Sequence, residues 1–503
     1  HHPCSPTARP RFRRRRTRRL PLLAPDPMSA TDRDDPETMS GSDRSEPGLN
    51  IVLGDRVDST SQGFSNLITT PDYVPPSPAL PQPEEQEESD DEDPEDYRPG
   101  GYHPVEIGER FNNGRYQVIK KLGWGHFSTV WLCYDKTAQK HVAVKVQKSA
   151  ENYADAARDE IRLLDSLKGS DPTGTEHSVV ELLDHFEHEG PHGTHICLVF
   201  EVLGKSLLSL IRRCNYRGAP ISLVKVIARE VLEGLMFLHE SCNIIHTDIK
   251  PENVLFVPPR EEFERLNTEA REVAILLGEE PVNEARVTEA INRLRINQDD
   301  IDPDLAFSSE KLKVVDLGNA CWVNEHFTEE IQTRQYRSPE VIIGAGYDTS
   351  ADVWSSACMF FEVATGDYLF DPQSGRNYTR DEDHLALMSE LMGPVPLHLI
   401  LRGSLFQNFF TRTGELRHIA KLNFWGLRDV LREKYQFRPD DADQFASFLL
   451  PMLVFDPARR ASCRSALNHP FLRTESAAMA AEAGLERQSS SFQDMGGAGE
   501  TLE

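Results

Sequence analysis

Two absences bound the kind of protein that this sequence encodes. No apolar run approaches the roughly 18 residues that a membrane-spanning helix needs. The eight cysteines contain no CxxC pair and no spacing typical of a zinc site. Most of them stand in apolar surroundings, which favours reduced core thiols in an intracellular protein; these are Cys133, Cys197, Cys242, Cys321 and Cys358. The sequence therefore argues against a membrane protein and against a disulfide-stabilised fold.

Positive charge is scarce as well. The net charge is −26, and this acidity argues against direct binding to nucleic acid and favours basic partners. The exception is the run RPRFRRRRTRR at residues 9–19. Because Met28 resembles a natural start, we interpret residues 1–27 as an artefact of upstream translation or cloning; the alternative is a basic localisation or RNA-binding arm.

The composition divides the chain into four regions. Residues 1–100 end in the run EEQEESDDEDPED and are predicted to be a disordered extension, because they bury too little apolar surface. Residues 101–203 read as short strands with one helix, and residues 204–472 are dominated by helical patterns. Residues 473–503 are small and polar, which predicts a flexible tail.

The stretch HTDIKPEN at residues 246–253 carries the chemistry. Phosphoryl transfer from ATP needs an Asp, a Lys and an Asn at this spacing. Asp248 can orient a hydroxyl group and accept its proton, Lys250 can neutralise the moving phosphoryl group, and Asn253 can hold a magnesium ion. Thr247 stands where most protein kinases carry Arg.

Further motifs lie on both sides of this stretch, in the order along the chain that is typical of protein kinases. LGWGHFSTVW at residues 122–131 resembles a phosphate-covering hairpin, in which Gly123 and Gly125 let the backbone approach the phosphates. Lys145 matches the strand lysine that binds phosphates, and Glu160 is its expected partner on a helix. Asp316 opens a DLG variant of the DFG motif and is the second expected magnesium ligand.

The nucleotide site is expected to continue into the segment CLVFEVLG at residues 197–204, which resembles a kinase hinge. The backbone at Glu201 and Leu203 would hydrogen-bond adenine, with Phe200 as gatekeeper. The remaining residues expected to contact the nucleotide are apolar: Leu122, Val130 and Ala143.

The activation segment ends in TRQYRSPE at residues 333–340. Glu340 is predicted to pair with Arg460, and Thr333 to hydrogen-bond near Asp248 and Lys250. Asp352 is predicted to anchor the backbone of the catalytic loop. Together these motifs imply an α+β fold, the bilobal protein kinase fold with a strand-rich N-lobe and a helical C-lobe. A pseudokinase scaffold is the alternative, but Lys145, Asp248 and Asp316 are all present.

One segment departs from the kinase pattern. Far more residues separate Asn253 from Asp316 than the dozen or so that a kinase needs, and we interpret residues 258–309 as an insert. Val282, Ala285, Ile291 and Leu294 suggest an amphipathic helix within it. The insert is either a surface excursion without consequence or a regulatory or anchoring spacer.

Several stretches resemble the SR-protein kinase family, whose members phosphorylate Ser in the Arg-Ser repeats of splicing factors. They are DYRPGGYHPV, KLGWGHFSTVWL, HTDIKPENVL, DLGNACW, IQTRQYRSPEV and YTRDEDHLALMSELMG. The resemblance implies a monomeric serine/threonine kinase that uses ATP and Mg²⁺ and is present in cytoplasm and nucleus. LAMMER-type kinases share HTD and are the alternative, but they carry an EHLAMME-like run where this chain has EDHLALMSE.

The resemblance also implies a docking groove for cationic Arg-Ser substrates. Its residues map to Asp367, Asp383, Glu390 and Lys434, and the acidic members would pair with substrate Arg. The alternative is that these are ordinary solvated surface charges. Because Thr247 cannot bind a phosphate by ion pairing, we also expect an enzyme that is active without phosphorylation of its activation loop.

Overall fold

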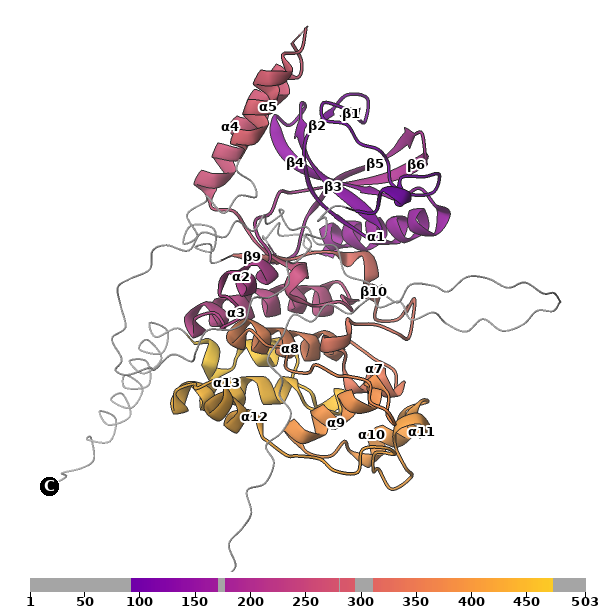
Figure 1. Ribbon diagram of the computed structural model, residues 1–503, viewed down its shortest axis with the longest axis vertical. Helices are drawn as coiled ribbons and strands as arrows, with labels where there is room; N and C mark the ends of the chain where they lie inside the picture. Colours follow the sequence, from indigo (N-terminus) through magenta and orange to yellow (C-terminus); the bar gives the residue numbers. More distant parts are fainter. Residues whose placement is uncertain (1–91, 171–176, 280, 295–310, 474–503) are drawn as a thin grey trace, which may run out of the picture.

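The computed structural model describes residues 92–170, 177–279, 281–294 and 311–473, which form two lobes (Figure 1). The N-lobe is built on one antiparallel sheet with the strand order β1-β2-β3-β4-β6-β5. Its elements are β1 (Arg110–Phe111), β2 (Tyr116–Gly125), β3 (Ser128–Asp135), β4 (Lys140–Gln147), α1 (Glu151–Ser170), β5 (Leu182–Gly190) and β6 (Gly193–Phe200). The predicted α+β, bilobal kinase fold is confirmed.

The two faces of the sheet bury different sets of side chains, because successive residues of a strand point to opposite sides. Leu132, Ala143 and Leu198 face the main core that contains α1. Trp131, Val142 and their neighbours form a second cluster on the outer face, and Val105 packs against that cluster. The chain that precedes β1 therefore helps to cover the outer face.

The C-lobe is helical and surrounds α8 (Ser350–Thr365), whose residues after Ser350 are all buried. Its other helices are α2 (Leu207–Arg213), α3 (Ile221–Met236), α7 (Pro339–Ile343), α9 (Arg380–Met392), α10 (Leu397–Arg402), α11 (Phe406–Phe409), α12 (Leu427–Asp429), α13 (Pro439–Met452) and α14 (Cys463–Leu467). Its shorter helical turns are η2 (Phe237–Ser241), η3 (Pro251–Asn253), η4 (Leu317–Asn319), η5 (Arg334–Tyr336), η6 (Val430–Lys434), η7 (Pro457–Arg459) and η8 (Pro470–Leu472), whereas η1 (Pro94–Asp96) belongs to the segment that packs onto the N-lobe.

Two small antiparallel ladders lie where the lobes meet. β7 (Ile244–Ile245) pairs with β10 (Cys321–Trp322), and β8 (Val254–Phe256) pairs with β9 (Leu312–Val314). The first ladder precedes the HTDIKPEN loop and the second follows it. Together they hold this loop beside the DLG motif, although more than sixty positions separate the two in the sequence.

The predicted boundary of the disordered extension is wrong for its last residues. Residues 92–100 pack onto the N-lobe: Glu92 is buried and bonds to Lys121, and Asp96 accepts a hydrogen bond of 2.9 Å from Lys148. The acidic composition gave no sign of these contacts, because Glu92 and Asp96 bind lysines that are distant in the sequence. The rest of the extension and the predicted tail lie outside the described residues.

The predicted burial of five cysteines is confirmed for Cys133, Cys197, Cys242, Cys321 and Cys358. Burial raises the pKa of the Cys133 and Cys358 thiols well above the usual range. Within the described ranges, no helix combines the length and the apolar character that crossing a membrane requires.

The insert forms a helical hairpin that packs against the N-lobe beside β2 and β4 (Figure 1). α4 (Arg260–Leu276) had not been predicted, and α5 (Glu284–Arg293) confirms the predicted amphipathic helix. The predicted apolar face is partly wrong, because Val282 and Ala285 are exposed and Val287 and Ala290 are buried instead. Residues 295–309 of the insert lie outside the described residues.

Polar and aromatic contacts hold α4 against the start of β4. The Oδ1 atom of Asn267 accepts a hydrogen bond of 3.0 Å from the backbone N–H of His141, and Phe263 packs on the His141 ring at 4.5 Å. Leu266 and Ala270 are buried in the main core. The described part of the insert is therefore anchored to the N-lobe, and a regulatory role for it stays a prediction.

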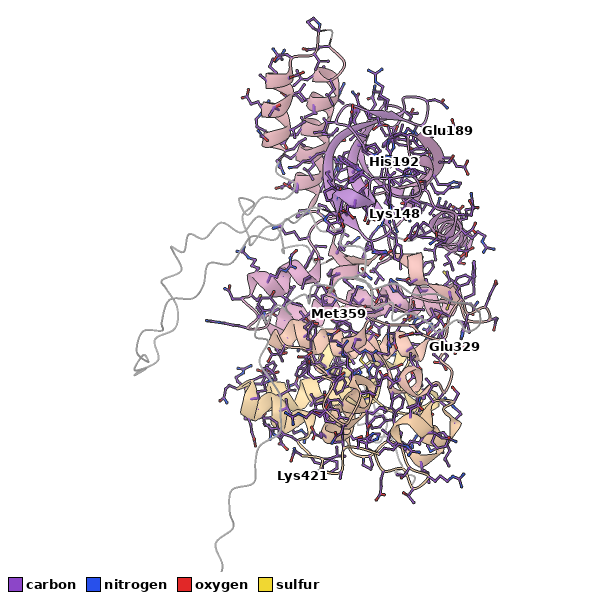
Figure 2. The ribbon with its side chains drawn as sticks, turned by 45° about the vertical axis from the view of Figure 1, so that its right-hand side comes forward. Lys148, Glu189, His192, Glu329, Met359 and Lys421 are labelled. Atoms are coloured by element: carbon purple, nitrogen blue, oxygen red, sulfur yellow. The ribbon has the colours of Figure 1, made fainter. Side chains whose placement is uncertain are left out.

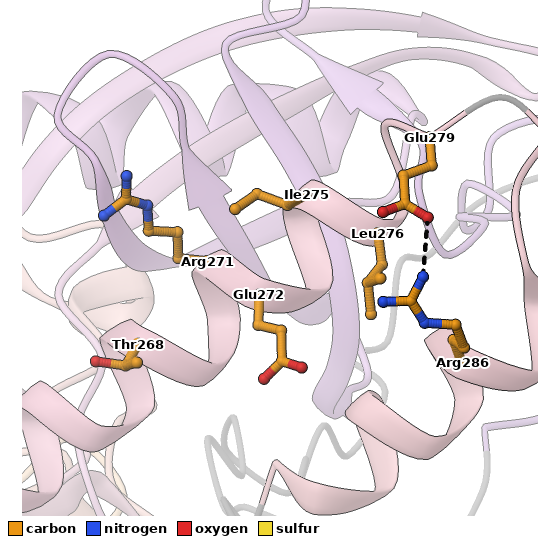
Figure 3. A pocket seen from close by; sticks show the side chains of 7 residues that line it. All are labelled: Thr268, Arg271, Glu272, Ile275, Leu276, Glu279 and Arg286. Carbon is orange, nitrogen blue, oxygen red and sulfur yellow. Dashed lines mark hydrogen bonds and ion pairs between the residues drawn. The ribbon is translucent and has the colours of Figure 1, made fainter.

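A hollow of about 270 Å³ lies along α4, next to the start of α5 (Figure 3). It is lined by Thr268, Arg271, Glu272, Ile275, Leu276, Glu279 and Arg286. Glu279 and Arg286 form an ion pair of 3.3 Å across the turn between the helices. An exposed ion pair of this kind contributes little stability, so the buried face must hold the hairpin in place.

Removing a buried side chain of α4 should therefore destabilise the fold. We expect Leu266→Ala to lower the free energy of unfolding by about 2 to 5 kcal/mol, the usual cost of a cavity at a buried leucine. Ile275→Ala, on the same helix but 58% exposed, should change it by less than about 0.5 kcal/mol. Chemical denaturation of both variants measures the difference, and equal effects would show that the hairpin is not docked.

Candidate active site

The backbone of the catalytic loop is held from below by Asp352 of α8. Its two carboxylate oxygens accept hydrogen bonds of 2.8 Å each from the backbone N–H groups of His246 and Thr247. The side chain of His239 contacts the same carboxylate at 2.8 Å. Thr247 adopts a left-handed conformation with φ 69°, which this pair of bonds supports. The predicted anchoring role of Asp352 is confirmed.

Asp248 lies at the centre of a compact polar group. One of its oxygens accepts a hydrogen bond of 2.6 Å from the Thr333 hydroxyl, and the other lies 2.7 Å from Nζ of Lys250. Nζ of Lys250 also donates to the Thr333 hydroxyl at 3.2 Å. The predicted contacts of Thr333 are confirmed. They place a carboxylate, an ammonium group and the activation segment within one hydrogen-bonded cluster.

Lys145 joins three elements through buried charges. Its Nζ atom lies 2.9 Å from both carboxylate oxygens of Glu160 on α1, and 3.3 Å from Asp316. Burial by itself would lower the pKa of Lys145, but the two carboxylates outweigh burial and raise it. Burial raises the pKa of Glu160 despite the opposing charge of Lys145. The predicted Lys145–Glu160 ion pair is confirmed.

Asn253 and Asp316 offer the oxygen ligands that Mg²⁺ prefers. The side-chain N–H₂ of Asn253 donates to the backbone oxygen of Asp248 at 2.9 Å, which turns the amide oxygen the other way. That oxygen is buried and has no hydrogen-bond partner among the described residues. A buried, unpaired carbonyl oxygen is costly unless it binds something, so the residues present fit a magnesium ion.

The apolar part of the predicted nucleotide site is assembled by strand pairing. Gly123 pairs with Val130 across the β2–β3 hairpin, and Val130 in turn pairs with Lys145 of β4. Gly125 ends β2 at the tip of this hairpin. Leu122, Val130 and Ala143 are all buried in the main core, as are Phe200 and Leu203.

The side chain of Glu201 turns away from the expected adenine site. It lies 2.6 Å from Nζ of Lys313 and accepts a hydrogen bond from the backbone of Glu181. Only its backbone remains for a nucleotide, in agreement with the prediction from the hinge-like segment. No contact in the protein alone tests the adenine contacts, and they stay a prediction.

One residue of this region had not been predicted. The hydroxyl group of Tyr102 donates a hydrogen bond of 2.7 Å to the carbonyl oxygen of Gly125, in the glycine-rich loop. Lys148 lies over the Tyr102 ring at 4.4 Å, and Figure 2 shows it on the N-lobe. The segment before the sheet thus holds the phosphate-covering hairpin. No local pattern could reveal this contact, because its partners come together only in the folded N-lobe.

The end of the activation segment is tied to the C-lobe by a buried ion pair. Arg460 donates to the two oxygens of Glu340 at 2.6 and 2.7 Å, and both side chains are fully buried. The predicted pair is confirmed. Its bidentate geometry holds α7 against the end of the chain's helical core.

The predicted docking residues lie in two places in the C-lobe. Asp367 follows α8 and lies 3.1 Å from Nζ of Lys434, with the Tyr435 hydroxyl at 2.9 Å. Asp383 and Glu390 both lie on α9, where each accepts a backbone N–H, from Gln373 and Asn423 respectively. All four are partly or fully buried, so none is a freely solvated side chain, and their docking role stays a prediction.

Two acidic residues beside them had not been predicted to matter. Asp381 forms an ion pair with Arg334 of the activation segment, which links α9 to the substrate-facing loop. Glu382 is almost fully buried and accepts a hydrogen bond of 2.6 Å from the backbone of His418. The run RDEDH shows three adjacent carboxylates in the sequence. Only the fold shows that Asp381 and Glu382 bind other parts of the protein, whereas Asp383 is a candidate for substrate docking.

The protein kinase domain family matches residues 116–266 and 293–472 of this chain, and the gap falls within the insert. Serine/threonine-protein kinase SRPK of Physarum polycephalum is 47% identical over 75% of this chain and 90% of its own length. Protein kinase dsk1 of Schizosaccharomyces pombe is 42% identical, over 75% of this chain and 84% of that protein. SRSF protein kinase 3 of Mus musculus is 39% identical, over 75% and 89%.

The chain belongs to the SR-protein kinase family. It is a serine/threonine protein kinase, and its ATP-handling residues lie as such an enzyme needs them. Asp248 accepts a hydrogen bond from Thr333 of the activation segment, and Lys145 is held by Glu160 and Asp316. Asn253 keeps a buried amide oxygen without a partner among the described residues. These contacts also argue against the pseudokinase alternative.

Two substitutions test the roles of the charged residues. Asp248→Asn removes the carboxylate that would accept the serine proton, and Lys145→Met removes the ammonium group that would bind phosphates. We expect each variant to lower kcat/KM by about a hundredfold or more. Circular dichroism should show a native fold, and a radiometric kinase assay measures the loss. Near-normal turnover in either variant would contradict the assignment.

Proposed function

We propose that this kinase transfers phosphate from ATP, with Mg²⁺, to serine residues in the Arg-Ser repeats of splicing factors. The observation that carries the proposal is the identity to relatives whose names specify SR-protein substrates, such as SRSF protein kinase 3. The acidic groups of α9 add physical support, because an Arg-Ser repeat is strongly cationic.

The residues of the catalytic loop would act on the serine hydroxyl. Asp248 would accept its proton and Lys250 would stabilise the charge on the transferred phosphoryl group. The Thr333 hydroxyl bonds to both side chains, so it would hold them in fixed positions relative to each other during the transfer. Bound Mg²⁺, held by Asn253 and Asp316, would neutralise charge on the phosphates.

The docking proposal rests on the placement of carboxylates along α9. Asp383 and Glu390 are seven residues apart, which is two helical turns, and so they lie on the same side of the helix. A carboxylate has about four lone-pair sites, so each of these groups can accept hydrogen bonds from an Arg side chain in addition to the backbone N–H that it already accepts. Arg binds carboxylates through two parallel hydrogen bonds, which suits this role.

The substrate proposal predicts a selective kinase. Phosphate should be transferred to an Arg-Ser repeat peptide and not to acidic or proline-directed peptides of equal length. The double substitution Asp383→Lys with Glu390→Lys should raise KM for a long Arg-Ser substrate by about tenfold, because the acidic side of α9 becomes cationic. The effect should shrink at high salt, where the wild-type pairing is already screened.

A short Arg-Ser peptide that fills only the active site is the internal control, and its phosphorylation should change little. Asp440→Lys reverses an exposed charge on α13 and should leave both substrates unaffected. If the double variant raises KM equally for the long and the short substrate, the docking proposal is wrong but the proposed substrate class is not contradicted. If acidic peptides are preferred, the substrate class itself is wrong.

We further propose that the activation segment is ordered without phosphorylation. Thr247 carries no charge, and its hydroxyl group donates to the carbonyl oxygen of Asn319 at 2.8 Å. This bond connects the catalytic loop directly to the start of the activation segment. A neutral hydrogen bond therefore stands where other kinases use an Arg–phosphate contact.

Gln332 supports the other end of the segment. Its buried amide group donates to the carbonyl oxygen of Ala351 at 2.8 Å and to the Ser355 hydroxyl at 2.9 Å, both on α8. Its amide oxygen accepts the backbone N–H of Ser338 at 2.9 Å. The same oxygen accepts a hydrogen bond of 3.1 Å from the Ser338 hydroxyl, so one uncharged side chain satisfies four hydrogen-bonding groups without a phosphate.

The enzyme should accordingly be active as synthesised. Protein made in bacteria, shown by mass spectrometry to be unmodified at Thr328 and Thr333, should phosphorylate its substrate at the full rate. Gln332→Ala should lower kcat by about tenfold, because it leaves buried groups on α8 unpaired. Gln444→Ala, at an exposed position of α13, is the matched control. Activity that appears only after treatment with an upstream kinase would refute the proposal.

A further inference from the structure

Two imidazoles and a carboxylate meet on the outer side of the N-lobe, away from the nucleotide site. The Nε2 atom of His103 lies 2.9 Å from Oε1 of Glu109, and the Nε2 atom of His188 lies 3.2 Å from the same oxygen. One potential ligand atom from each residue lies within 4.8 Å of the other two. None of the three residues contacts the catalytic loop, and the catalytic argument uses none of them.

The ligands come from two parts of the chain that only the fold brings together. His103 and Glu109 lie in residues 102–109, the strap, which runs along the outer face of the sheet before β1. His188 lies on β5, and the backbone pairs it with His195 of β6. The strap therefore supplies two of the groups and the sheet supplies the third.

The approach of the His103 ring depends on a missing side chain. A Cβ atom at Gly190, the last residue of β5, would lie 2.4 Å from Nδ1 of His103. Nδ1 has no hydrogen-bond partner among the described residues, so the burial of the ring is offset only at Nε2, where Glu109 lies. Among the described residues, the His103 ring therefore makes its polar contact through Nε2 alone, on the side where Glu109 lies.

We propose that His103, Glu109 and His188 form a binding site for a divalent transition-metal ion, with Zn²⁺ as the best fit. Two imidazoles and one carboxylate are an established ligand set for zinc, with water in the fourth position. Ligands about 2.1 Å from a tetrahedral ion lie about 3.4 Å apart, close to the two measured N–O separations. Magnesium and calcium are disfavoured, because they prefer ligand sets made of oxygen.

Partial exposure gives the ion a route to the site. The side chain of His103 is only 5% exposed, but those of Glu109 and His188 are 22% and 18% exposed. Water can therefore reach the site and complete the coordination shell. A site with three protein ligands and an open position is expected to bind zinc less tightly than a closed structural site with four.

The ion would connect the strap to the sheet. Tyr102, the residue before His103, donates its hydroxyl to the carbonyl oxygen of Gly125 in the glycine-rich loop. His192, which Figure 2 shows on the same lobe beside Glu189, contacts the carbonyl oxygen of Tyr102 at 2.6 Å. A metal that holds His103 in place would thus steady the segment that supports the phosphate-covering hairpin.

The test uses the full chain, treated with chelator and then titrated with ZnCl₂ or CoCl₂ in the presence of excess Mg²⁺ and ATP. We expect one Zn²⁺ to bind per chain, and we expect Tm to rise by about 3 °C once the free ion exceeds its Kd about a hundredfold. Co²⁺ should give visible absorption bands of a low-symmetry four- or five-coordinate ion. Excess Mg²⁺ keeps the active site from contributing to either signal.

Variants decide whether these residues hold the ion. Glu109→Gln keeps the shape of the side chain, His188→Ala removes the ligand on the sheet, and both should weaken Zn²⁺ binding by about a hundredfold or more. His398→Ala removes one member of an exposed histidine–carboxylate pair with a separation of 3.0 Å and should leave binding unchanged. If Zn²⁺ has no effect on the wild-type chain, or if its effect persists in Glu109→Gln and His188→Ala, the proposal is wrong.

Discussion

The arrangement of the two lobes depends on the buried charges around Lys145. Lys145 lies on a strand of the sheet, Glu160 on α1, and Asp316 in the loop that follows β9. Separating any one of them would leave a charge in the protein interior, which costs several kcal/mol. Because each member comes from a different element, the ion pairs fix the position of α1 relative to the sheet and of both relative to the DLG motif. The nucleotide site is the space that this constraint defines.

The same reasoning explains how the catalytic loop keeps its unusual conformation. Thr247 and Asp316 both have left-handed backbones, with φ of 69° and 66°. Such conformations cost free energy and persist only where the surroundings over-determine them. Asp352 accepts hydrogen bonds from the backbone N–H groups of Thr247 and of His246 before it, and Lys145 contacts the side chain of Asp316. The strained backbone positions thus lie at the catalytic loop and the DLG motif, where phosphoryl transfer requires a fixed geometry.

Two segments outside the kinase core stabilise the N-lobe from different sides. Residues 92–109 pack along its outer face and reach the glycine-rich loop through Tyr102, whereas α4 of the insert packs beside β2 and β4. Both contact the lobe that carries the glycine-rich loop, and closure of loops over a bound substrate is a common conformational step in enzymes. The N-lobe is therefore held at two places outside the kinase core.

The sequence alone determined the chemistry, because phosphoryl transfer demands particular side chains at short, fixed spacings. HTDIKPEN, the glycine-rich loop and the DLG motif identified Asp248, Lys145 and Asp316 before any fold was known. It also predicted the contacts Lys145–Glu160 and Glu340–Arg460, since kinase motifs pair in a known way. What it could not predict were contacts whose partners are unrelated in sequence.

The tertiary structure decided those contacts. The packing of α4, the bond from Tyr102 to Gly125 and the meeting of His103, Glu109 and His188 each join distant segments through burial or a single polar group. A lone buried Tyr or His has no periodic pattern around it, so its partner becomes known only when the strands are in register. The acidic residues of α9 show the same limit. Their neighbours in space make one carboxylate part of an ion pair, another a buried anchor and two others candidate docking groups.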